Sequence, residues 1–176
     1  VKRILTEAGI HPTPEKEKKK PPLDWMTFIG AHMETIVATD FFTKDILTPL
    51  GKRTAYILVF IHLGSRRVHI SPPTYNPDSA WVTQQARNAN MWRHDLGVKP
   101  RFLIRDADKK FSGPFDEIWK TEDTRIIQIP HSAPQANAFC ESFIGTLKRE
   151  CLDFFICFSQ TQLAYILSTW RQHYHD

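Results

Sequence analysis

The sequence lacks the features that mark a secreted, membrane-spanning or zinc-binding protein. It has three cysteines in 176 residues, an odd number without CxxC spacing, which argues against both a disulfide framework and a zinc site. No run approaches the roughly eighteen apolar residues that a membrane span needs. The first residues (VKRI) do not lead into a hydrophobic signal core. These absences predict a soluble, intracellular protein with no membrane partner, in which the cysteines are reduced core thiols.

Composition and one charged stretch predict the domain organisation. With 41% hydrophobic residues the chain can form one substantial core, and its net charge of +4 mildly favours an anionic partner. The stretch EKEKKKPP (15–22) ends in two prolines, as solvated linkers do. We therefore expect an upstream unit at 1–14, a linker at 15–23 and the main domain at 24–176. The chain starts with Val and ends without a helix stop signal, so we expect a domain truncated at its C-terminus.

Apolar periodicity predicts the elements of the main domain. Three successive runs are rich in β-branched and aromatic residues, and the later strands alternate with helical patterns. The order βββαβαβαα predicts an α/β fold, a mixed sheet flanked by helices. The expected strands are 35–42, 54–63, 67–72, 101–105 and 125–129, and the expected helices are 77–96, 114–121, 133–155 and 160–173.

Two aspartates stand on predicted strands. Asp40 interrupts an apolar run, where an ionised carboxylate is costly unless a partner neutralises it. A turn cap or an ion pair with a nearby lysine is the alternative for Asp40. Asp106 follows the strand RFLIR, at a strand tip where catalytic groups of α/β sheets collect. A turn role is the alternative for Asp106.

A third carboxylate, Glu141, lies in the helix predicted at 133–155. At 100° per residue, Asn137, Glu141 and Lys148 share a side, and Gly145 keeps that side open. An isolated helical glutamate is usually only a solvated residue. The opposite stripe is expected to face the core; it comprises Phe139, Phe143, Leu147, Cys151 and Phe154.

Taken together, the three carboxylates predict a metal site. Hard carboxylate oxygens are the ligands that Mg²⁺ and Mn²⁺ prefer, and a pair of such ions stabilises the attacking and leaving oxygens of phosphoryl transfer.

Four blocks of the sequence closely resemble the DDE catalytic core of insertion-sequence transposases and retroviral integrases, from about Trp25 to the end. They are DWMTFIGAHMETIVATDFFT, YILVFIHLGSRRVHI, FLIRDADKKFSGPF and IPHSAPQANAFCESFIGTLKRECLDF. The resemblance implies a ribonuclease H-like fold and makes Asp40, Asp106 and Glu141 the catalytic, metal-holding triad. The separation 141 − 106 = 35 matches the close spacing of the family's second and third acidic residues.

The resemblance also implies DNA contacts. Lys148 matches the family lysine that contacts DNA near the active site, and Asn137 matches the position that shapes the helix start. Basic side chains could extend this surface, although charged residues of this kind are more often simply solvated. The predicted DNA-binding residues are Lys148, Asn137, Arg149, Lys109 and Lys110.

One departure from the family pattern concerns the second aspartate. Many members have Asp-x-Gly, whereas this chain has Asp106-Ala107-Asp108. We assign Asp106, because it ends the strand and fits the spacing, and expect Asp108 to face solvent or Lys110. Arg105, beside Asp106, is a candidate for orienting the site.

The predicted function is metal-dependent DNA strand cleavage and strand transfer, with two Mg²⁺ or Mn²⁺ ions and DNA ends and target DNA as partners. The resemblance further implies a homo-oligomer on DNA, a cytoplasmic or nucleoid location, and an upstream helix-turn-helix unit of which residues 1–14 are a remnant. Ser132 and Gln135 have the form of a capping box before the catalytic helix. The alternatives are a hydrolytic nuclease of the same fold, and an inactive domesticated core that binds DNA or a partner.

Overall fold

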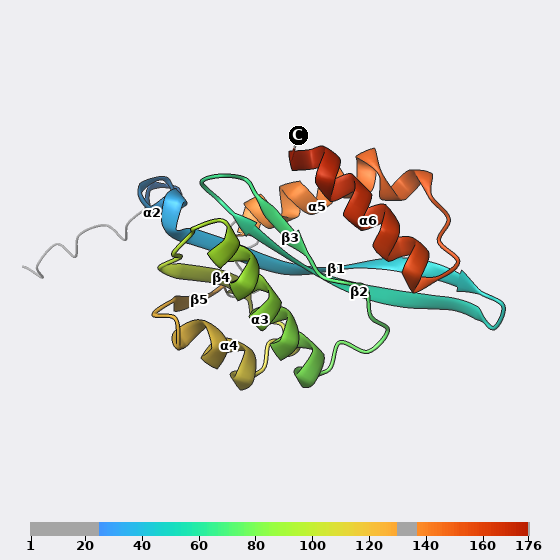
Figure 1. Ribbon diagram of the computed structural model, residues 1–176, viewed down its shortest axis with the longest axis horizontal. Coiled ribbons are helices and arrows are strands. Elements are labelled where there is room, and N and C mark those ends of the chain that lie inside the picture. The colour runs from blue at the N-terminus through green and yellow to red at the C-terminus, as the bar shows by residue number, and fades with distance from the viewer. Residues whose placement is uncertain (1–24, 130–136, 176) are drawn as a thin grey trace, which may run out of the picture. The chain divides into compact units, whose positions relative to one another are not determined.

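The computed structural model describes residues 25–129 and 137–175 (Figure 1). The chain divides into two compact units, residues 1–31 and 32–176, and each is described by itself. The described residues of the first unit, 25–31, lie in helix α2 (Trp25–His32), where the rings of Trp25 and Phe28 stack with their centroids 5.6 Å apart. The predicted helix-turn-helix remnant and linker lie outside the described residues and stay predictions.

The described part of the second unit contains a five-stranded mixed sheet in the order β3-β2-β1-β4-β5. The long strands β1 (Ile36–Thr48) and β2 (Gly51–His62) pair antiparallel, and β3 (Val68–Ile70) adds antiparallel to β2. On the other side, β4 (Phe102–Asp106) and β5 (Arg125–Ile129) continue the sheet in parallel. The predicted mixed sheet flanked by helices is confirmed.

The β1–β2 hairpin is longer than its hydrophobic pattern suggests. Strand β1 continues past the predicted end at Phe42 to Thr48, and β2 starts at Gly51. Gly51 has φ +111°, a conformation that favours glycine, and its carbonyl accepts a hydrogen bond from Thr48 Oγ1 at 2.8 Å. The tight turn therefore allows β1 and β2 to stay paired beyond the apolar core, at residues whose side chains are largely exposed.

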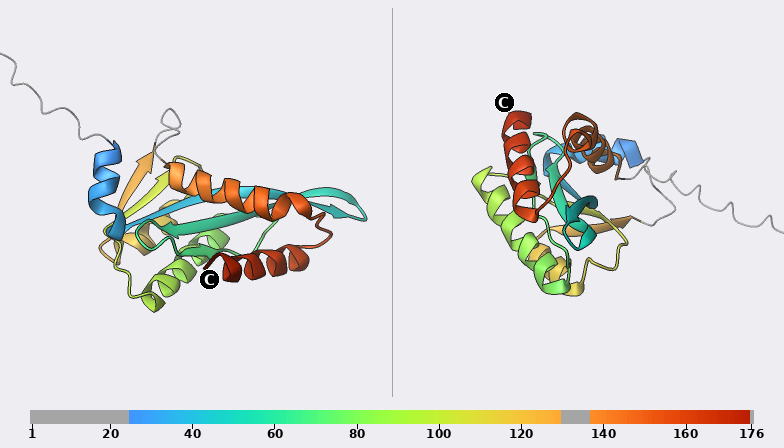
Figure 2. Two further views of the ribbon diagram at one scale, coloured as in Figure 1. Left: turned by 90° about the horizontal axis from the view of Figure 1, so that it is seen from above. Right: turned by 90° about the vertical axis from the view of Figure 1, so that its right-hand side faces the viewer.

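Helices α3 (Ser79–Asp95) and α4 (Gly113–Lys120) pack on one face of the sheet, and α5 (Ala138–Glu150) lies on the opposite face (Figure 2). Helix α6 (Gln160–His175) contacts the edge strand β3. The α3–α4 face buries an aromatic and aliphatic core cluster, and this apolar burial stabilises the sheet. Its fully buried members include Val37, Leu58, Phe60, Leu103, Phe115 and Trp119.

Helix α3 has a side-chain cap at its start and a glycine after its end. Asp78 is its N-cap and accepts a hydrogen bond from the Trp81 N–H at 2.8 Å. Gly97, with φ +66°, follows its last turn. No described helix is both long and apolar enough to cross a membrane.

The catalytic helix predicted at 133–155 is shorter in the structure. It ends at Glu150 and is followed by the 3-10 turn η3 (Leu152–Phe154). The chain then pairs with the edge of β1: Leu47 N–H donates to the Cys157 carbonyl at 2.8 Å, and Ile46 forms a parallel bridge with Cys157. The helical pattern of the sequence continues to residue 155, but the helix ends earlier because the following segment pairs with β1. The predicted capping box at Ser132 lies outside the described residues.

This early end corrects the predicted core stripe of α5. Phe143, Leu147 and Cys151 are buried as expected. Phe154 is 77% exposed, because it lies beyond the helix, and Phe139 is only half-buried. All three cysteines are buried free thiols.

Candidate active site

Asp40 and Asp106 lie side by side on the neighbouring parallel strands β1 and β4. The register pairs Ile36 with Phe102 and Ala38 with Ile104, and each aspartate is two residues beyond the second pair. Both side chains therefore point to the same face of the sheet, on strands about 4.8 Å apart. Strand pairing brings together two carboxylates that are 66 positions apart in the sequence.

Glu141 comes to this place from helix α5. The helix packs on β1 and β2, and the carboxylate of Glu141, in the first turn, is close enough to Asp40 to raise its pKa. The start of the helix is tied to the sheet, because Asn137 Nδ2 donates to the Thr39 carbonyl at 3.2 Å. Strands and helix thus converge on one acidic cluster.

Burial and nearby negative charge strongly perturb Asp40. Its pKa is raised from the ordinary 3.8 to about 6, mainly by burial and also by the negative charges of Asp106, Glu141 and Asp108. The Phe41 N–H, which donates to Asp40 Oδ1 at 2.7 Å, opposes this rise. Adjacent on α5, complete burial and the charges of Asp40 and Glu141 hold the pKa of the Cys140 thiol well above its usual range. The cluster concentrates negative charge that a cation would neutralise.

An open pocket of about 480 Å³ adjoins the carboxylates. Strand β4 ends at Asp106 while β1 continues to Thr48, so β4 does not cover the edge of β1 beyond Asp40, and Cys157 pairs with that edge only at Ile46 and Leu47. The lining combines acidic, basic, aromatic and small residues: Asp40, Asp108, Glu141, Lys110, Lys148, Phe41, Phe42, Thr43, Tyr56, Ile144 and Gly145. Asp106 itself does not line it.

Asp108 is held by Lys110 in the turn after β4. Lys110 Nζ lies 2.6 Å from Asp108 Oδ2, and the Lys110 N–H donates to Asp108 Oδ1 at 2.9 Å. The Asp108 N–H in turn donates to Asp106 Oδ1 at 3.2 Å. Asp108 therefore already has a cationic partner, which is one of the two placements expected from the sequence.

The donor set suits a hard divalent cation in type and charge, because it offers carboxylate oxygens whose mutual repulsion a cation relieves. Among residues 25–129 and 137–175, no three His, Cys, Asp or Glu side chains are close enough to ligate one ion as they stand. The chemistry of the donor set fits a hard divalent cation, although these side chains do not form a ready-made site.

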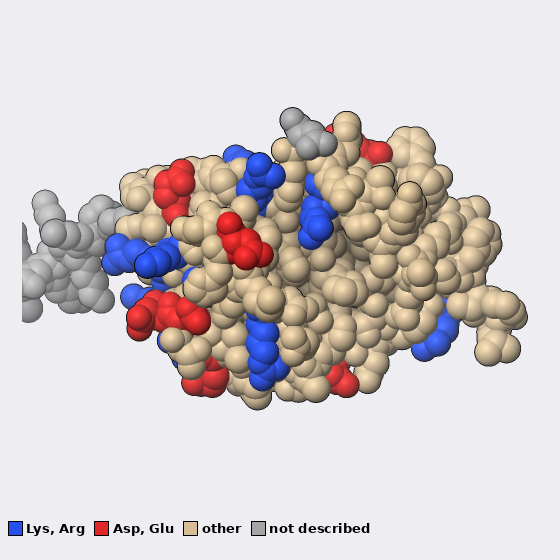
Figure 3. Space-filling view, viewed as in Figure 1, with Lys and Arg blue, Asp and Glu red and all other residues tan. Residues whose placement is uncertain are grey.

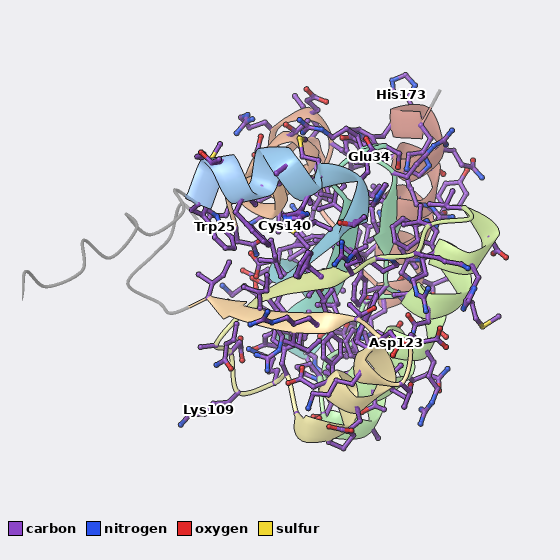
Figure 4. The ribbon with its side chains drawn as sticks, turned by 90° about the vertical axis from the view of Figure 1, so that its left-hand side faces the viewer. Trp25, Glu34, Lys109, Asp123, Cys140 and His173 are labelled. Carbon is purple, nitrogen blue, oxygen red and sulfur yellow. The ribbon has the colours of Figure 1, made fainter. Side chains whose placement is uncertain are left out.

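The predicted DNA-binding residues fall into three groups. Lys148 and Lys110 line the pocket, and the ammonium of Lys110 lies over the rings of Phe41 and Tyr56 at 5.2 and 5.5 Å. Lys109 is exposed and points away from the sheet, as Figure 4 shows. These three positions are compatible with contact to a polyanion.

The other two predicted contacts lie on or just before α5. Arg149 is exposed, and its guanidinium lies beside Gly145, where an added Cβ would come within 2.9 Å of Nη1. Asn137 is only 6% exposed and is engaged with Thr39. On the face seen in Figure 3, basic and acidic residues are interspersed and do not form a continuous basic surface.

Two residues that line the pocket, Thr43 and Tyr56, could not be predicted from the sequence. The hairpin register places Tyr56 directly opposite Thr43, and both line the pocket. Their spacing from Asp40 in the sequence carries no recognisable pattern. Only the register of a long β1–β2 hairpin could have identified them.

The chain was compared with family models, curated proteins and solved structures. Residues 122–176, which include Glu141, match the family model of the integrase core domain. Comparison with curated proteins found no match.

Among solved structures, a chain of the simian T-cell lymphotropic virus intasome, determined with the PP2A regulatory subunit B56 gamma, is 15% identical, with a TM-score of 0.54 over 69% of this chain and 41% of that one. The magnesium complex of the HTLV-2 integrase catalytic core domain is 16% identical in its dimeric form, with a TM-score of 0.49 over 68% of this chain and 71% of that one. This chain spans less than half the length of the intasome chain.

The fold is ribonuclease H-like, as the resemblance in the sequence implies. The family model thus matches residues 122–176, and the structural match shows the fold.

Proposed function

We propose that this integrase-type core cleaves DNA and joins DNA strands in a reaction that depends on divalent metal ions. The observation that carries the proposal is the convergence of Asp40, Asp106 and Glu141. The first two are level on parallel strands, and the third is close enough to contribute to an Asp40 pKa of about 6. A carboxylate with a raised pKa, gathered with other carboxylates beside an open pocket, is typical of catalytic sites.

Asp40, Asp106 and Glu141 would hold Mg²⁺ or Mn²⁺, with two ions in the active complex. Bound there, the ions would supply activation of water or of a DNA 3′-hydroxyl and stabilisation of the leaving oxygen. The chain itself would hold these ligands in fixed positions. Asp40 and Asp106 come from the paired strands β1 and β4, and Glu141 comes from α5, whose start is hydrogen-bonded to β1. Fixed positions favour in-line phosphoryl transfer, because that reaction depends mainly on positioning and electrostatics.

The pocket beside the carboxylates would receive the DNA. Lys148 and Lys110 are placed to contact phosphates, and Phe41 and Tyr56 provide an apolar wall. Asp108, already paired with Lys110, would lie beside the metal site as a neutralised group. We propose Arg149 and Lys109 as outer contacts and a homo-oligomer as the form that acts on DNA.

A labelled-end assay tests the proposal. The chain is incubated with a labelled duplex end and a target plasmid in Mg²⁺, Mn²⁺, Ca²⁺ or EDTA. Joined product in Mg²⁺ or Mn²⁺ alone supports strand transfer. Nicking without joining would favour the hydrolytic nuclease, and DNA binding without either reaction would favour an inactive binding module.

A further inference from the structure

The buried side chain of Arg105, which is 7% exposed, links two elements beside the site. Its Nε and Nη2 donate to the two carboxylate oxygens of Asp116 at 2.9 and 2.7 Å, a paired arrangement that fixes the guanidinium plane. Its Nη1 donates to the main-chain carbonyl of Asp106 at 2.8 Å. One guanidinium thus connects the end of β4 to the first half of α4.

These contacts close the loop that follows the second aspartate. The loop runs from the end of β4 to Ser112, the N-cap of α4, and Arg105 holds both of its sides. Beneath the guanidinium lies the ring of Phe111, with its centroid 5.3 Å from Cζ, and Phe111 is buried in the α3–α4 core. The loop is therefore anchored to the hydrophobic core immediately after Asp106.

The pair of Arg105 and Asp116 is internally neutral. A lone guanidinium beside Asp106 would compete with a metal ion for its carboxylate, whereas a guanidinium neutralised by Asp116 offers a hydrogen bond to the main chain without a net positive charge. Arg105 donates to the main-chain carbonyl of Asp106 and not to its carboxylate. Because neighbouring side chains of a strand point to opposite faces, the Asp106 carboxylate lies on the face of the sheet opposite to Arg105.

We propose that Arg105, held by Asp116, is a positioning residue that fixes the main chain at Asp106 so that its carboxylate stays level with Asp40. This inference rests on the proposed function and deepens it by naming what orients the second metal-holding residue. A residue that orients a ligand typically changes metal affinity or activity by about 10- to 100-fold when it is removed.

A purely structural ion pair is the competing explanation, and the chain contains a matched control. Arg93 is also buried, and its Nη2 lies 2.6 Å from Glu122 Oε2, while its Nε donates to Asn90. This pair joins α3 to the segment after α4, and within the described residues it forms no hydrogen bond or ion pair with Asp40, Asp106 or Glu141. Replacing a buried ion pair by apolar residues of similar size is often neutral or stabilising.

The experiment compares the wild-type chain with R105M/D116L and with the control R93M/E122L. Mn²⁺ binding to the protein alone is measured from the EPR signal of free Mn²⁺, and loop order is measured by amide hydrogen exchange at residues 107–110. Strand joining and thermal unfolding are measured alongside. We expect R105M/D116L to unfold as a cooperative domain, to bind Mn²⁺ about 10- to 100-fold more weakly and to exchange faster at 107–110. R93M/E122L should match the wild type in Mn²⁺ binding and exchange.

R105K provides a second variant, because it keeps the charge but loses the two-pronged contact. R105K should also bind Mn²⁺ more weakly and exchange faster at residues 107–110. If R105M/D116L does not fold, R105K alone tests the positioning role of Arg105. Wild-type Mn²⁺ affinity in both Arg105 variants would overturn the inference alone. A wild-type chain that binds no Mn²⁺ would overturn the proposed function, and the positioning role would fall with it.

Discussion

Asn137 Nδ2 donates a hydrogen bond to the main-chain carbonyl of Thr39 at 3.2 Å. This bond joins the residue before Asp40 to the residue one helical turn before Glu141. Asn137 Oδ1 and Thr39 Oγ1 are both buried and lack a hydrogen-bond partner within the described structure. The separation between the first and third carboxylates therefore depends on a direct link between β1 and the start of α5.

The two aspartates after β4 are predicted to differ in function. D106N should abolish cleavage and joining, because Asp106 is level with Asp40 on the neighbouring strand. D108N should keep most activity, because an asparagine oxygen can still accept the Lys110 N–H that now bonds Asp108 Oδ1. Joining rates of the two purified variants decide between them, and an active D106N with an inactive D108N would show that the second ligand is Asp108.

The stability of the metal-free protein should depend on pH through Asp40. Because the folded pKa of about 6 lies above the ordinary 3.8, the folded state binds more protons between these values. Stability from this group is therefore present in full below about pH 4 and is lost as pH rises through about 6, by at most about 3 kcal/mol.

D40N removes this titration. In EDTA, its unfolding free energy should exceed that of the wild type at pH 7.5, and the difference should shrink towards pH 4. Urea unfolding at several pH values measures this. A wild-type stability curve that runs parallel to that of D40N from pH 4 to 7.5 would contradict the raised pKa of Asp40.

Lys148 should contribute about one phosphate contact. K148A is expected to weaken binding to DNA ends and to make the slope of log affinity against log salt shallower by about 0.9. The matched control is K120A, which removes an exposed lysine paired with Glu117 on α4, outside the pocket. Fluorescence anisotropy at several salt concentrations gives both slopes, and equal slopes for the two variants would leave Lys148 as a solvated residue.

Gly145 is predicted to lower the stability of α5 while keeping the pocket open. G145A should stabilise α5 by about 0.5–1 kcal/mol, since alanine is the better helix former. Only the mobile tip of Arg149 has to shift. The added methyl group would intrude on the pocket wall shared with Glu141 and Lys148, so joining should slow at least about tenfold. Chemical denaturation measures the stability of G145A, and a joining assay measures its rate. A stabilised variant with unchanged joining would show that the pocket tolerates a methyl group at position 145.

The sequence predicts the sheet and its flanking helices well, because β-branched runs and helical periodicity directly reflect burial. The aspartates Asp40 and Asp106 could be chosen because they interrupt or end such runs. The end of α5 could not be predicted, because it depends on Cys157 pairing with β1, which lies over 100 residues earlier. The same holds for Tyr56, which reaches the pocket only through the register of the hairpin.

The most direct test of the carboxylate cluster is strand joining by E141Q. The substitution removes one metal-holding charge but keeps the shape of an exposed side chain in the first turn of α5. E150Q, an exposed glutamate at the end of the same helix, is the control. With a labelled DNA end in Mg²⁺, we expect no joined product from E141Q, wild-type joining from E150Q, and equal folding and DNA binding for both. Appreciable joining by a folded E141Q would contradict the assignment of Asp40, Asp106 and Glu141 as the catalytic triad.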